Sequence, residues 1–445
     1  MPGFWCELAW LGGATATAGV LLTVEEGRIT AVATGSTCPP GATRLAGLTL
    51  PGLANAHSHA FHRALRGRTQ VGTGSFWTWR DQMYRLASRL SPDSYFQLAR
   101  AVYGEMALAG ITSVGEFHYL HHGQGGVPYA DPNSMSAALV AAANDAGVRL
   151  TLLDTLYLHG GIGVAPNEVQ QRFSDGDADS WAARVSSFRP EDPSVVVGAA
   201  IHSVRAVDPR SMRVAQEWAT SVCAPIHAHV SEQKLENHQC IDAYGATPTV
   251  LLGELGILGD RFTSVHGTHL SAVDVSLYGS QRCTVCMCPT TERDLADGIG
   301  SAGALREMGA RISLGSDSHA VIDLFEEARA VELDERLATN VRGRHDARSL
   351  LEAATSNGQR CLGRPDAGTL AADSVADFIT VGLDSVRMAG TTGANALESA
   401  VFAAGAADVD HVVVGGRVIV QDGRHRAFDV AAELQRTIAL VSGDQ

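Results

Sequence analysis

The sequence has almost no lysine. Lys234 is the only one in 445 residues, so arginine supplies nearly all of the positive charge. Arginine stays protonated at all ordinary pH values and pairs with carboxylates through two parallel hydrogen bonds. The formal net charge of the chain is −14. Proteins that bind nucleic acid usually present a basic surface, so this charge argues against such a partner.

Long apolar runs are also missing. No stretch of about 18 apolar residues occurs, so no membrane span is predicted. The N-terminal segment has no basic residue before Arg28, unlike a conventional secretory signal. The eight cysteines are scattered and do not resemble the disulfide framework of a small secreted protein. A reducing cytoplasm is therefore the expected location.

The middle of the chain alternates strand-like and helix-like segments. The intervals between the strands are rich in helix formers, as in 136–146 and 303–308. Such alternation implies parallel strands, and eight of them imply a closed (β/α)8 barrel, with a doubly wound open sheet as the alternative. The length suits a large barrel with an accessory piece. The eight predicted strands are 48–53, 111–114, 149–153, 195–201, 225–229, 263–266, 283–287 and 311–314.

Both ends of the chain are rich in strands. Residues 19–24 and 28–32 predict one hairpin, and residues 411–414 and 417–420 predict another around a two-glycine turn. A lone hairpin is barely stable, so the two ends are expected to combine into one small β-sandwich domain. This domain would comprise residues 1–49 and 376–445, and the barrel would occupy residues 50–375. Two independent β patches are the alternative.

Polar side chains follow the C-terminal end of every predicted barrel strand. In a barrel these ends converge on one mouth, where active sites of this fold lie. Unrelated loops would not be expected to repeat His, Glu, Asp and Tyr at the same structural position so often. The segments concerned are 57–59, 116–119, Tyr157, 202–205, 229–232, 266–269, 290–292 and 317–319.

Two histidine pairs indicate a metal site at this mouth. His57 and His59 lie two residues apart at a strand end, so their imidazoles would point to the same side. Zn–N bonds of about 2.0–2.1 Å would allow them to share one ion. His227 and His229 repeat the spacing, and Glu232 follows as a candidate proton carrier. Spacing alone does not decide which of the second pair is a ligand, and either pair is also compatible with ordinary polar strand ends.

The remaining candidate residues are interpreted either as functional or as structural. Asp317 is a candidate fourth ligand, although a Gly-Ser-Asp turn also commonly caps a helix. The cysteines within 283–288 lie in a strand-like run, where buried cysteine behaves as a small apolar residue, so they are expected in the core. His121 and His122 lie on a glycine-rich loop and are expected to be solvated.

These motifs resemble the amidohydrolase superfamily. The shared positions are His57-Ser58-His59 after the first barrel strand, His229 after the fifth, His266 after the sixth and Asp317 after the eighth. Within this superfamily, further stretches are similar to the formimidoylglutamate deiminase family. They are 57–64, 76–80, 116–122, 202–207, 288–292 and 315–319. The resemblance covers essentially the whole chain.

The resemblance implies one zinc ion per subunit, although nitrogen and oxygen ligands accept several divalent ions. Its implied ligands are His57, His59, His229 and Asp317. It also implies that Glu232 and His266 handle protons, while Asp317 helps to position the nucleophile. Many binuclear members use a carboxylated lysine to bridge two metals. Lys234 lies beyond the fifth strand end, the wrong place for that role, so a mononuclear site fits.

The implied reaction is hydrolysis of N-formimino-L-glutamate, an intermediate of histidine degradation, to N-formyl-L-glutamate and ammonia. Zinc lowers the pKa of bound water to about 7, which would supply hydroxide to attack the formimino carbon. The substrate carries two carboxylates, which arginines are suited to bind. The implied substrate contacts are Arg80, Tyr119, His202 and Arg205, with His62 beside the metal strand as a further one. Barrels of this family are often homodimers.

Two positions depart from the expected family pattern. His62 stands where glutamine is expected, and Arg293-Asp294 stands where Ala-Asn is expected near the mouth. The nearest alternative is therefore another mononuclear deaminase that acts on a purine, a pyrimidine or a related heterocycle. A metal-bearing sensor without turnover is an alternative of a different class. Two arginines aimed at the pocket favour a dicarboxylate substrate, and retention of Glu232 and His266 favours an enzyme.

Overall fold

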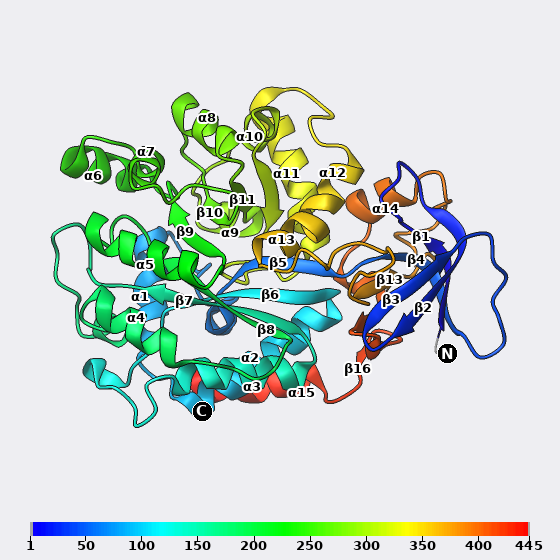
Figure 1. Ribbon diagram of the computed structural model, residues 1–445, viewed down its shortest axis with the longest axis horizontal. Helices are drawn as coiled ribbons and strands as arrows, with labels where there is room; N and C mark the ends of the chain where they lie inside the picture. The colour runs from blue at the N-terminus through cyan, green and yellow to red at the C-terminus, as the bar shows by residue number, and fades with distance from the viewer. Residues whose placement is uncertain (1–2, 444–445) are drawn as a thin grey trace.

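The computed structural model describes residues 3–443. Its larger part is a barrel of eight parallel strands, each hydrogen-bonded to the next in chain order (Figure 1). Most residues of these strands are buried, because helices cover the outside and side chains fill the inside. The strands are β5 (Leu53–Ser58), β6 (Ile111–His118), β7 (Arg149–Leu156), β8 (Val195–Ile201), β9 (Ile226–Val230), β10 (Phe262–His266), β11 (Thr284–Met287) and β12 (Arg311–Leu314).

The first and last barrel strands meet at their C-terminal ends. Ser58 forms a parallel bridge with Asp317, whose backbone N–H donates to the carbonyl of His57 at 3.1 Å. Gly315 makes this approach feasible, since a Cβ at this position would lie 2.7 Å from Cβ of His57. The nearly closed (β/α)8 barrel is thus confirmed over the open sheet.

Helices surround the barrel, as the alternation predicts (Figure 1). Local sequence sets their ends: Ser91 accepts the N–H of Ser94 at the start of α2, and Pro92 fills the first turn. Gly147, with φ of 77°, ends α3. The barrel helices are α1 (Phe76–Ala87), α2 (Pro92–Leu108), α3 (Ser134–Ala146), α4 (Ala178–Ser187), α5 (Pro209–Ser221), α6 (Lys234–Tyr244), α7 (Pro248–Glu254), α8 (Ala272–Ser280), α9 (Pro289–Asp294), α10 (Ala302–Glu307), α11 (Leu324–Thr339), α12 (Ala347–Glu352) and α13 (Gly358–Cys361).

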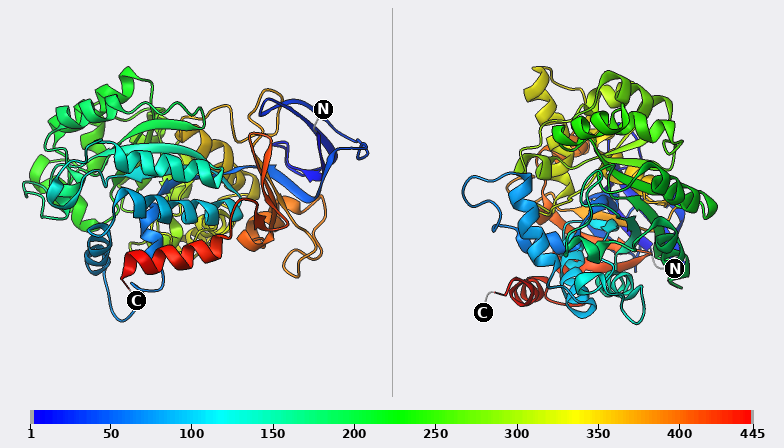
Figure 2. Two further views of the ribbon diagram at one scale, coloured as in Figure 1. Left: turned by 90° about the horizontal axis from the view of Figure 1, so that it is seen from below. Right: turned by 90° about the vertical axis from the view of Figure 1, so that its left-hand side faces the viewer.

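A second sheet draws its strands from both ends of the chain and lies at one end of the molecule (Figure 2). It has eight strands in the order β16-β15-β14-β13-β4-β1-β2-β3. The two halves join where β13 pairs antiparallel with β4, and Phe4 packs edge-on against Phe378 at 5.0 Å between ring centroids. The strands are β1 (Gly3–Ala9), β2 (Thr17–Glu25), β3 (Arg28–Ala33), β4 (Thr43–Pro51), β13 (Phe378–Val381), β14 (Val409–Val414), β15 (Arg417–Gln421) and β16 (Arg424–His425).

The predicted opening strand 48–53 is wrong in detail. Its first part ends β4 of the second sheet, and β5 of the barrel begins only at Leu53. The change of sheet occurs at Gly52, where a Cβ would lie 2.2 Å from Oγ1 of Thr112. Strand β1 and the first part of β4, residues 43–47, were not predicted. The second sheet is confirmed as a joint product of both termini, while the domain boundaries at 49/50 and 375/376 stay a prediction.

Two helices follow the second-sheet strands in the C-terminal part. Helix α14 (Ala396–Phe402) contacts α11 and α12, and α15 (Val430–Ser442) packs along α2 of the barrel (Figure 2). The C-terminal segment therefore spans both parts of the molecule. Among residues 3–443 no helix has both the length and the apolar character that crossing a membrane requires.

Candidate metal centre and active site

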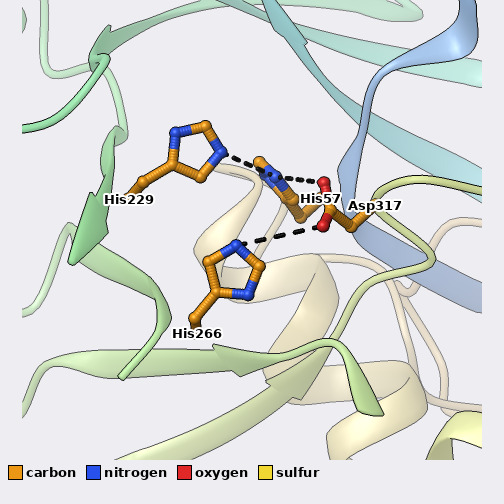
Figure 3. Close-up of side chains that lie close together, drawn as sticks. All are labelled: His57, His229, His266 and Asp317. Carbon is orange, nitrogen blue, oxygen red and sulfur yellow. Dashed lines mark hydrogen bonds and ion pairs between the residues drawn. The ribbon is translucent and has the colours of Figure 1, made fainter. Parts of the chain in front are cut away.

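Five side chains from distant parts of the chain converge at the barrel mouth, and Figure 3 shows four of them: His57, His229, His266 and Asp317. His57 ends β5, His229 lies in β9, and Asp317 follows β12. Nε2 of His57 lies 3.2 Å from Oδ1 of Asp317 and 3.1 Å from Nε2 of His229. His59, just beyond β5, places its Nε2 3.4 Å from the same carboxylate oxygen. His266 of β10 completes the group, with Nε2 3.9 Å from Oδ2 of Asp317.

The backbone fixes the orientation of two of these imidazoles. Nδ1 of His59 contacts the carbonyl oxygen of Phe117 at 2.9 Å, and Nδ1 of His229 contacts that of His202 at 2.9 Å. A carbonyl only accepts, so each Nδ1 carries the hydrogen and each Nε2 turns a lone pair towards the centre. The lone pair of His59 then faces a carboxylate oxygen with no proton between them. A cation would compensate this repulsion, and the nitrogen and oxygen donors suit zinc.

Charge states in the cluster agree with this arrangement. Burial lowers the pKa of His57, His59 and His229 below its ordinary value, which keeps all three imidazoles neutral and able to ligate. Burial alone would raise the pKa of Asp317, but the hydrogen bond with His57, together with the charge of His266, outweighs it and holds that pKa well below its usual range. The carboxylate therefore stays ionised at neutral pH.

A group of acidic side chains surrounds His266. Its Nε2 lies 3.8 Å from Oε1 of Glu232, and its Nδ1 lies 3.5 Å from Oε1 of Glu292. Burial raises the pKa of Glu232 to about 7, although the charges of His266 and Arg205 oppose the rise. For His266, burial lowers the pKa, but Glu232, Glu292 and Asp317 together raise it well above its ordinary value. Two buried titratable groups with shifted pKa values, Glu232 and His266, thus lie side by side next to the metal cluster.

A cavity of about 240 Å³ opens above the cluster. All five residues predicted to contact substrate line it: His62, Arg80, Tyr119, His202 and Arg205. The guanidinium of Arg80 lies 4.5 Å from the ring centroid of Trp77, and that of Arg205 lies 3.6 Å from Glu236. Among the described residues, Nε of each arginine is buried without a hydrogen-bond partner. The cavity therefore joins a metal cluster to two cations.

The chain is similar to known proteins in sequence and in fold. Residues 48–419 match the amidohydrolase family.

The chain belongs to this family.

As an amidohydrolase, it is a hydrolase that acts on carbon–nitrogen bonds. It is 38% identical to a formimidoylglutamate deiminase from Pseudomonas aeruginosa over 410 residues, which cover 88% of this chain and 89% of the relative. It is 29% identical to an 8-oxoguanine deaminase from the same organism over 439 residues, which cover 95% of this chain and 94% of that one.

Solved structures show the same architecture. A crystal structure of an amidohydrolase from Brucella melitensis superposes with a TM-score of 0.93 at 32% sequence identity, covering 99% of this chain and 100% of the other. An adenosine deaminase from Xanthomonas campestris with bound zinc superposes with a TM-score of 0.85 at 21% identity, covering 99% of this chain and 98% of the other. The second likeness concerns the fold alone.

The structure of the present protein shows which histidine of the pair His227 and His229 faces the metal cluster. His229 points into the metal cluster, whereas Nε2 of His227 contacts the carbonyl of Cys361 at 3.0 Å on the core side. His62 lies on a 3-10 turn (Ala60–Leu65), and its Nε2 is 3.0 Å from the hydroxyl of Tyr119. The cysteines Cys283, Cys286 and Cys288 are buried and free, which confirms that they belong to the core.

The prediction that His121 and His122 are solvated is wrong. Both are buried: Nε2 of His121 contacts the carbonyl of Thr155 at 2.9 Å, and Nε2 of His122 lies 3.0 Å from Oδ1 of Asp175. Their backbone N–H groups both donate to the carbonyl of Arg172, on the segment that covers them. That cover comes from 50 residues away in the sequence, so local composition gave no sign of it.

The Arg293-Asp294 departure lies outside the cavity. Arg293 is 2.8 Å from Asp334 and 3.0 Å from Glu326 on α11, and Asp294 accepts a hydrogen bond from Gln70 at 2.7 Å. Neither residue is among those that line the cavity. The departure therefore changes the protein surface rather than the wall of the cavity, while the His62 departure changes the wall itself.

Three buried residues near the cluster had no role assigned from sequence: Glu292, Glu116 and His319. Glu292 lies beside His266, as described above. Glu116 accepts hydrogen bonds from the hydroxyl of Ser58 and the N–H of Ala60, both at 2.7 Å. The sequence offered one signal for Glu116, its place at the end of a predicted barrel strand. Its partners Ser58 and Ala60 lie 58 and 56 residues earlier in the sequence and were not foreseeable.

Proposed function

We propose that this amidohydrolase removes ammonia hydrolytically from N-formimino-L-glutamate and leaves N-formyl-L-glutamate. The observation that carries the proposal is the cavity, which has a histidine–aspartate cluster at one side and two guanidinium groups, Arg80 and Arg205, in its wall. A dicarboxylate with an amidine end matches this distribution of charge. The similarity to a formimidoylglutamate deiminase supports the same substrate.

The metal would be one zinc ion per subunit, held by His57, His59, His229 and Asp317. Zinc in such a site acidifies water and polarises a carbon–nitrogen double bond. The chain itself supplies the proton transfers. Glu232, whose pKa burial raises to about 7, accepts a proton from the attacking water and delivers it to the formimino nitrogen that leaves as ammonia. His266 and Asp317 hold the nucleophile in line for attack.

The far end of the substrate would be bound by charge. Arg80 and Arg205 each retain an unpaired buried Nε–H, so each can form paired hydrogen bonds with a carboxylate without first losing one at that atom. Tyr119, with His62 behind it, and His202 add polar contacts to the same wall. Stacking on Trp77 restricts the motion of Arg80 and lowers the entropy lost on binding.

Deamination of a purine or related heterocycle is the second candidate. The similarity to an 8-oxoguanine deaminase and to 5-methylthioadenosine/S-adenosylhomocysteine deaminases favours it. A neutral base would give neither guanidinium an anionic partner, and Arg205 would keep only the longer contacts with Glu232 at 3.9 Å and Glu236 at 3.6 Å. The dicarboxylate is therefore the better match. A homodimer and a cytoplasmic location remain predictions from the sequence.

The test is release of ammonia by the zinc-loaded protein. Wild-type protein should release ammonia from N-formimino-L-glutamate, and Glu232→Ala should lose about 10²–10⁴-fold of the rate. Guanine and 5′-deoxyadenosine serve as competing substrates. Ammonia from either of these, with none from N-formimino-L-glutamate, would replace the proposal by the second candidate. No release from any amidine or aminoheterocycle would contradict both.

A further inference from the structure

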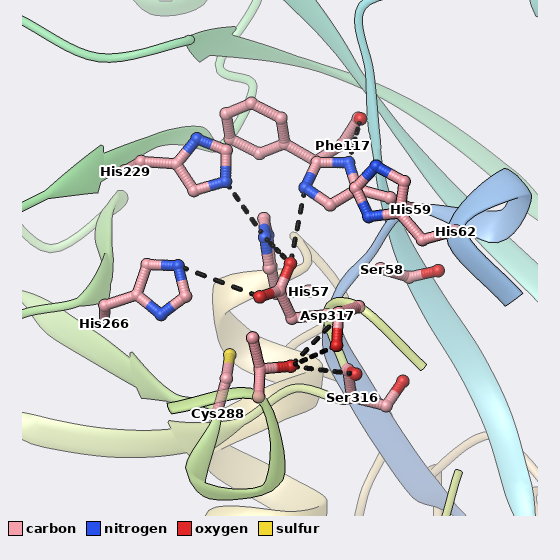
Figure 4. A network of polar contacts seen from close by, with 12 residues as sticks. His57, Ser58, His59, His62, Phe117, His229, His266, Cys288, Ser316 and Asp317 are labelled. Carbon is pink, nitrogen blue, oxygen red and sulfur yellow. Dashed lines mark hydrogen bonds and ion pairs between the residues drawn. The ribbon is translucent and has the colours of Figure 1, made fainter. Parts of the chain in front are cut away.

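A continuous chain of hydrogen bonds lies behind the predicted metal ligands. It joins five buried side chains: Glu116, Ser58, His319, Ser316 and Asn55. The Ser58 hydroxyl is 2.7 Å from Oε2 of Glu116 and 3.2 Å from Nε2 of His319. Nδ1 of His319 is 3.0 Å from Oγ of Ser316. The same Oγ accepts a hydrogen bond from Nδ2 of Asn55 at 2.7 Å. Figure 4 shows Ser58 and Ser316 close to Asp317.

The two ends of this chain determine the direction of every hydrogen in it. Burial raises the pKa of Glu116 to about 7, while hydrogen bonds from Ala60, Ser58 and two tyrosines favour its ionised form. As a carboxylate, Glu116 only accepts, so the Ser58 hydroxyl donates to it and must itself accept from Nε2–H of His319. At the other end, Oδ1 of Asn55 accepts the N–H of Ser316 at 3.0 Å, which leaves Nδ2 to donate to the Ser316 hydroxyl. That hydroxyl then donates to Nδ1 of His319. His319 is thereby fixed as the Nε2–H tautomer.

The chain of hydrogen bonds connects the two segments that carry three of the predicted metal ligands. Ser58 lies between His57 and His59 at the end of β5, and Ser316 directly precedes Asp317 after β12. The latter segment is strained, because Asp317 and His319 have φ values of 40° and 57°, which non-glycine residues rarely adopt. Such a conformation persists only where surrounding contacts determine it. The hydrogen-bond chain supplies these contacts across the seam of the barrel.

We propose that Glu116 and His319 are positioning residues that hold His57, His59 and Asp317 in the geometry the cation requires. They act through Ser58 and Ser316 and touch neither substrate nor metal. This role rests on the metal site of the proposed function. It adds a requirement that the ligand set alone does not contain: a buried carboxylate on β6 that terminates the hydrogen-bond chain.

The substitution Glu116→Gln isolates this requirement. It preserves the volume of the side chain and the acceptor for Ala60, but it turns a donor towards Ser58. Ser58 would then accept from both neighbours, and its own hydrogen would have no acceptor. Reversing the chain offers no escape, because Ser316 would face donors from both Asn55 and His319. The substitution therefore breaks one bond of the chain without creating a cavity.

The first measurement is zinc affinity by competition with a chromogenic chelator. Glu116→Gln should bind zinc about 10- to 100-fold more weakly than wild type. The matched control is Glu335→Gln. Glu335 is a buried glutamate of α11 that accepts the N–H of Gly303 at 2.8 Å and takes no part in the chain of hydrogen bonds. The control substitution should lower the melting temperature but keep wild-type zinc affinity. Unchanged zinc affinity in folded Glu116→Gln, or an equal loss in Glu335→Gln, would overturn the positioning role.

The second measurement needs no metal. Long-range ¹H–¹⁵N spectra of histidine-labelled, metal-free protein report the tautomer of each imidazole, and His319 is assigned from its loss in His319→Gln. Wild type should show Nε2–H at His319, whereas Nδ1–H would overturn the hydrogen-bond direction. Wild-type protein that binds no zinc would overturn the positioning role together with the metal site. Zinc binding without ammonia release would contradict only the proposed substrate.

Discussion

The guanidinium of Arg205 lies 3.9 Å from the carboxylate of Glu232. A residue proposed to bind substrate therefore also contributes to the charge around the proposed proton carrier. Arg205 lowers the pKa of Glu232, against the larger effect of burial, which raises it. In the proposed mechanism, the contact between Arg205 and Glu232 would link substrate binding to proton transfer.

Replacing Arg205 by methionine tests this link. Loss of a charged hydrogen-bond partner should lower kcat/KM for N-formimino-L-glutamate by about 10- to 100-fold, mainly through a higher KM. Because the lost cation stabilised ionised Glu232, the acid limb of the pH–rate profile should also move to higher pH. Arg210→Met, on the exposed start of α5, is the control and should behave as wild type. An unaltered kcat/KM in Arg205→Met would remove this residue from the substrate site.

Asp317→Ala should abolish zinc binding. The change removes the only carboxylate of the predicted ligand set and the partner of both His57 and His59. Metal analysis after dialysis should find about one zinc per wild-type subunit and almost none in the variant. The control is Asp294→Ala, which changes a surface residue outside the cavity and should keep its zinc and its activity. Retention of zinc by Asp317→Ala would exclude that aspartate from the metal site.

Acid should destabilise the fold partly through His121. Burial, and secondarily the charge of Arg184, lowers the pKa of His121 to about 4 from an ordinary value of 6.5. As pH falls from about 6.5 to 4, the unfolded chain binds a proton here that the folded chain rejects, so stability falls across this window. The shift corresponds to about 3 kcal/mol for this one group.

Urea unfolding of His121→Gln between pH 7 and 4 measures that contribution. The variant should lose less stability than wild type over this range, even if it is less stable at pH 7. His238→Gln, at an exposed position of α6, should show the wild-type slope. Equal slopes in wild type and His121→Gln would show that His121 does not contribute to acid unfolding.

Arg184→Met should be among the most destabilising changes in the barrel wall. Arg184 is buried and bridges Asp154 at 2.8 Å and Asp175 at 2.8 Å. Removing it leaves two buried carboxylates without their cation, which costs about 3–5 kcal/mol. Differential scanning calorimetry should record a clear drop in Tm. The control is Arg348→Met, which breaks an exposed pair with Glu352 and should leave Tm unchanged.

The sequence predicted those parts of the fold that depend on short-range pattern. Strands β8 and β12 match the predicted bounds, because β8 is a continuous apolar run and β12 alternates polar and apolar residues. The candidate site could also be predicted from the sequence, since parallel strands bring their C-terminal ends together whatever lies between them. His57, His229 and Asp317 converge for this reason, although 172 residues separate the first two.

Features that depend on contacts between distant segments could not be predicted from the sequence. His121 is buried by a segment far along the chain, so a glycine-rich neighbourhood gave the wrong expectation. The break at Gly52 was missed because an apolar run looks the same whether one sheet or two bury it. The hydrogen-bond chain from Glu116 to Asn55 joins three separate segments, and only their packing reveals which polar groups meet.

The lone lysine has a practical consequence. Lys234 is exposed at the start of α6, two positions beyond Glu232, which lines the cavity. Apart from the α-amino group, amine-directed reagents therefore find a single target on the polypeptide. A fluorophore attached to Lys234 would lie near the entrance of the cavity, and its emission would follow ligand entry without any engineered cysteine.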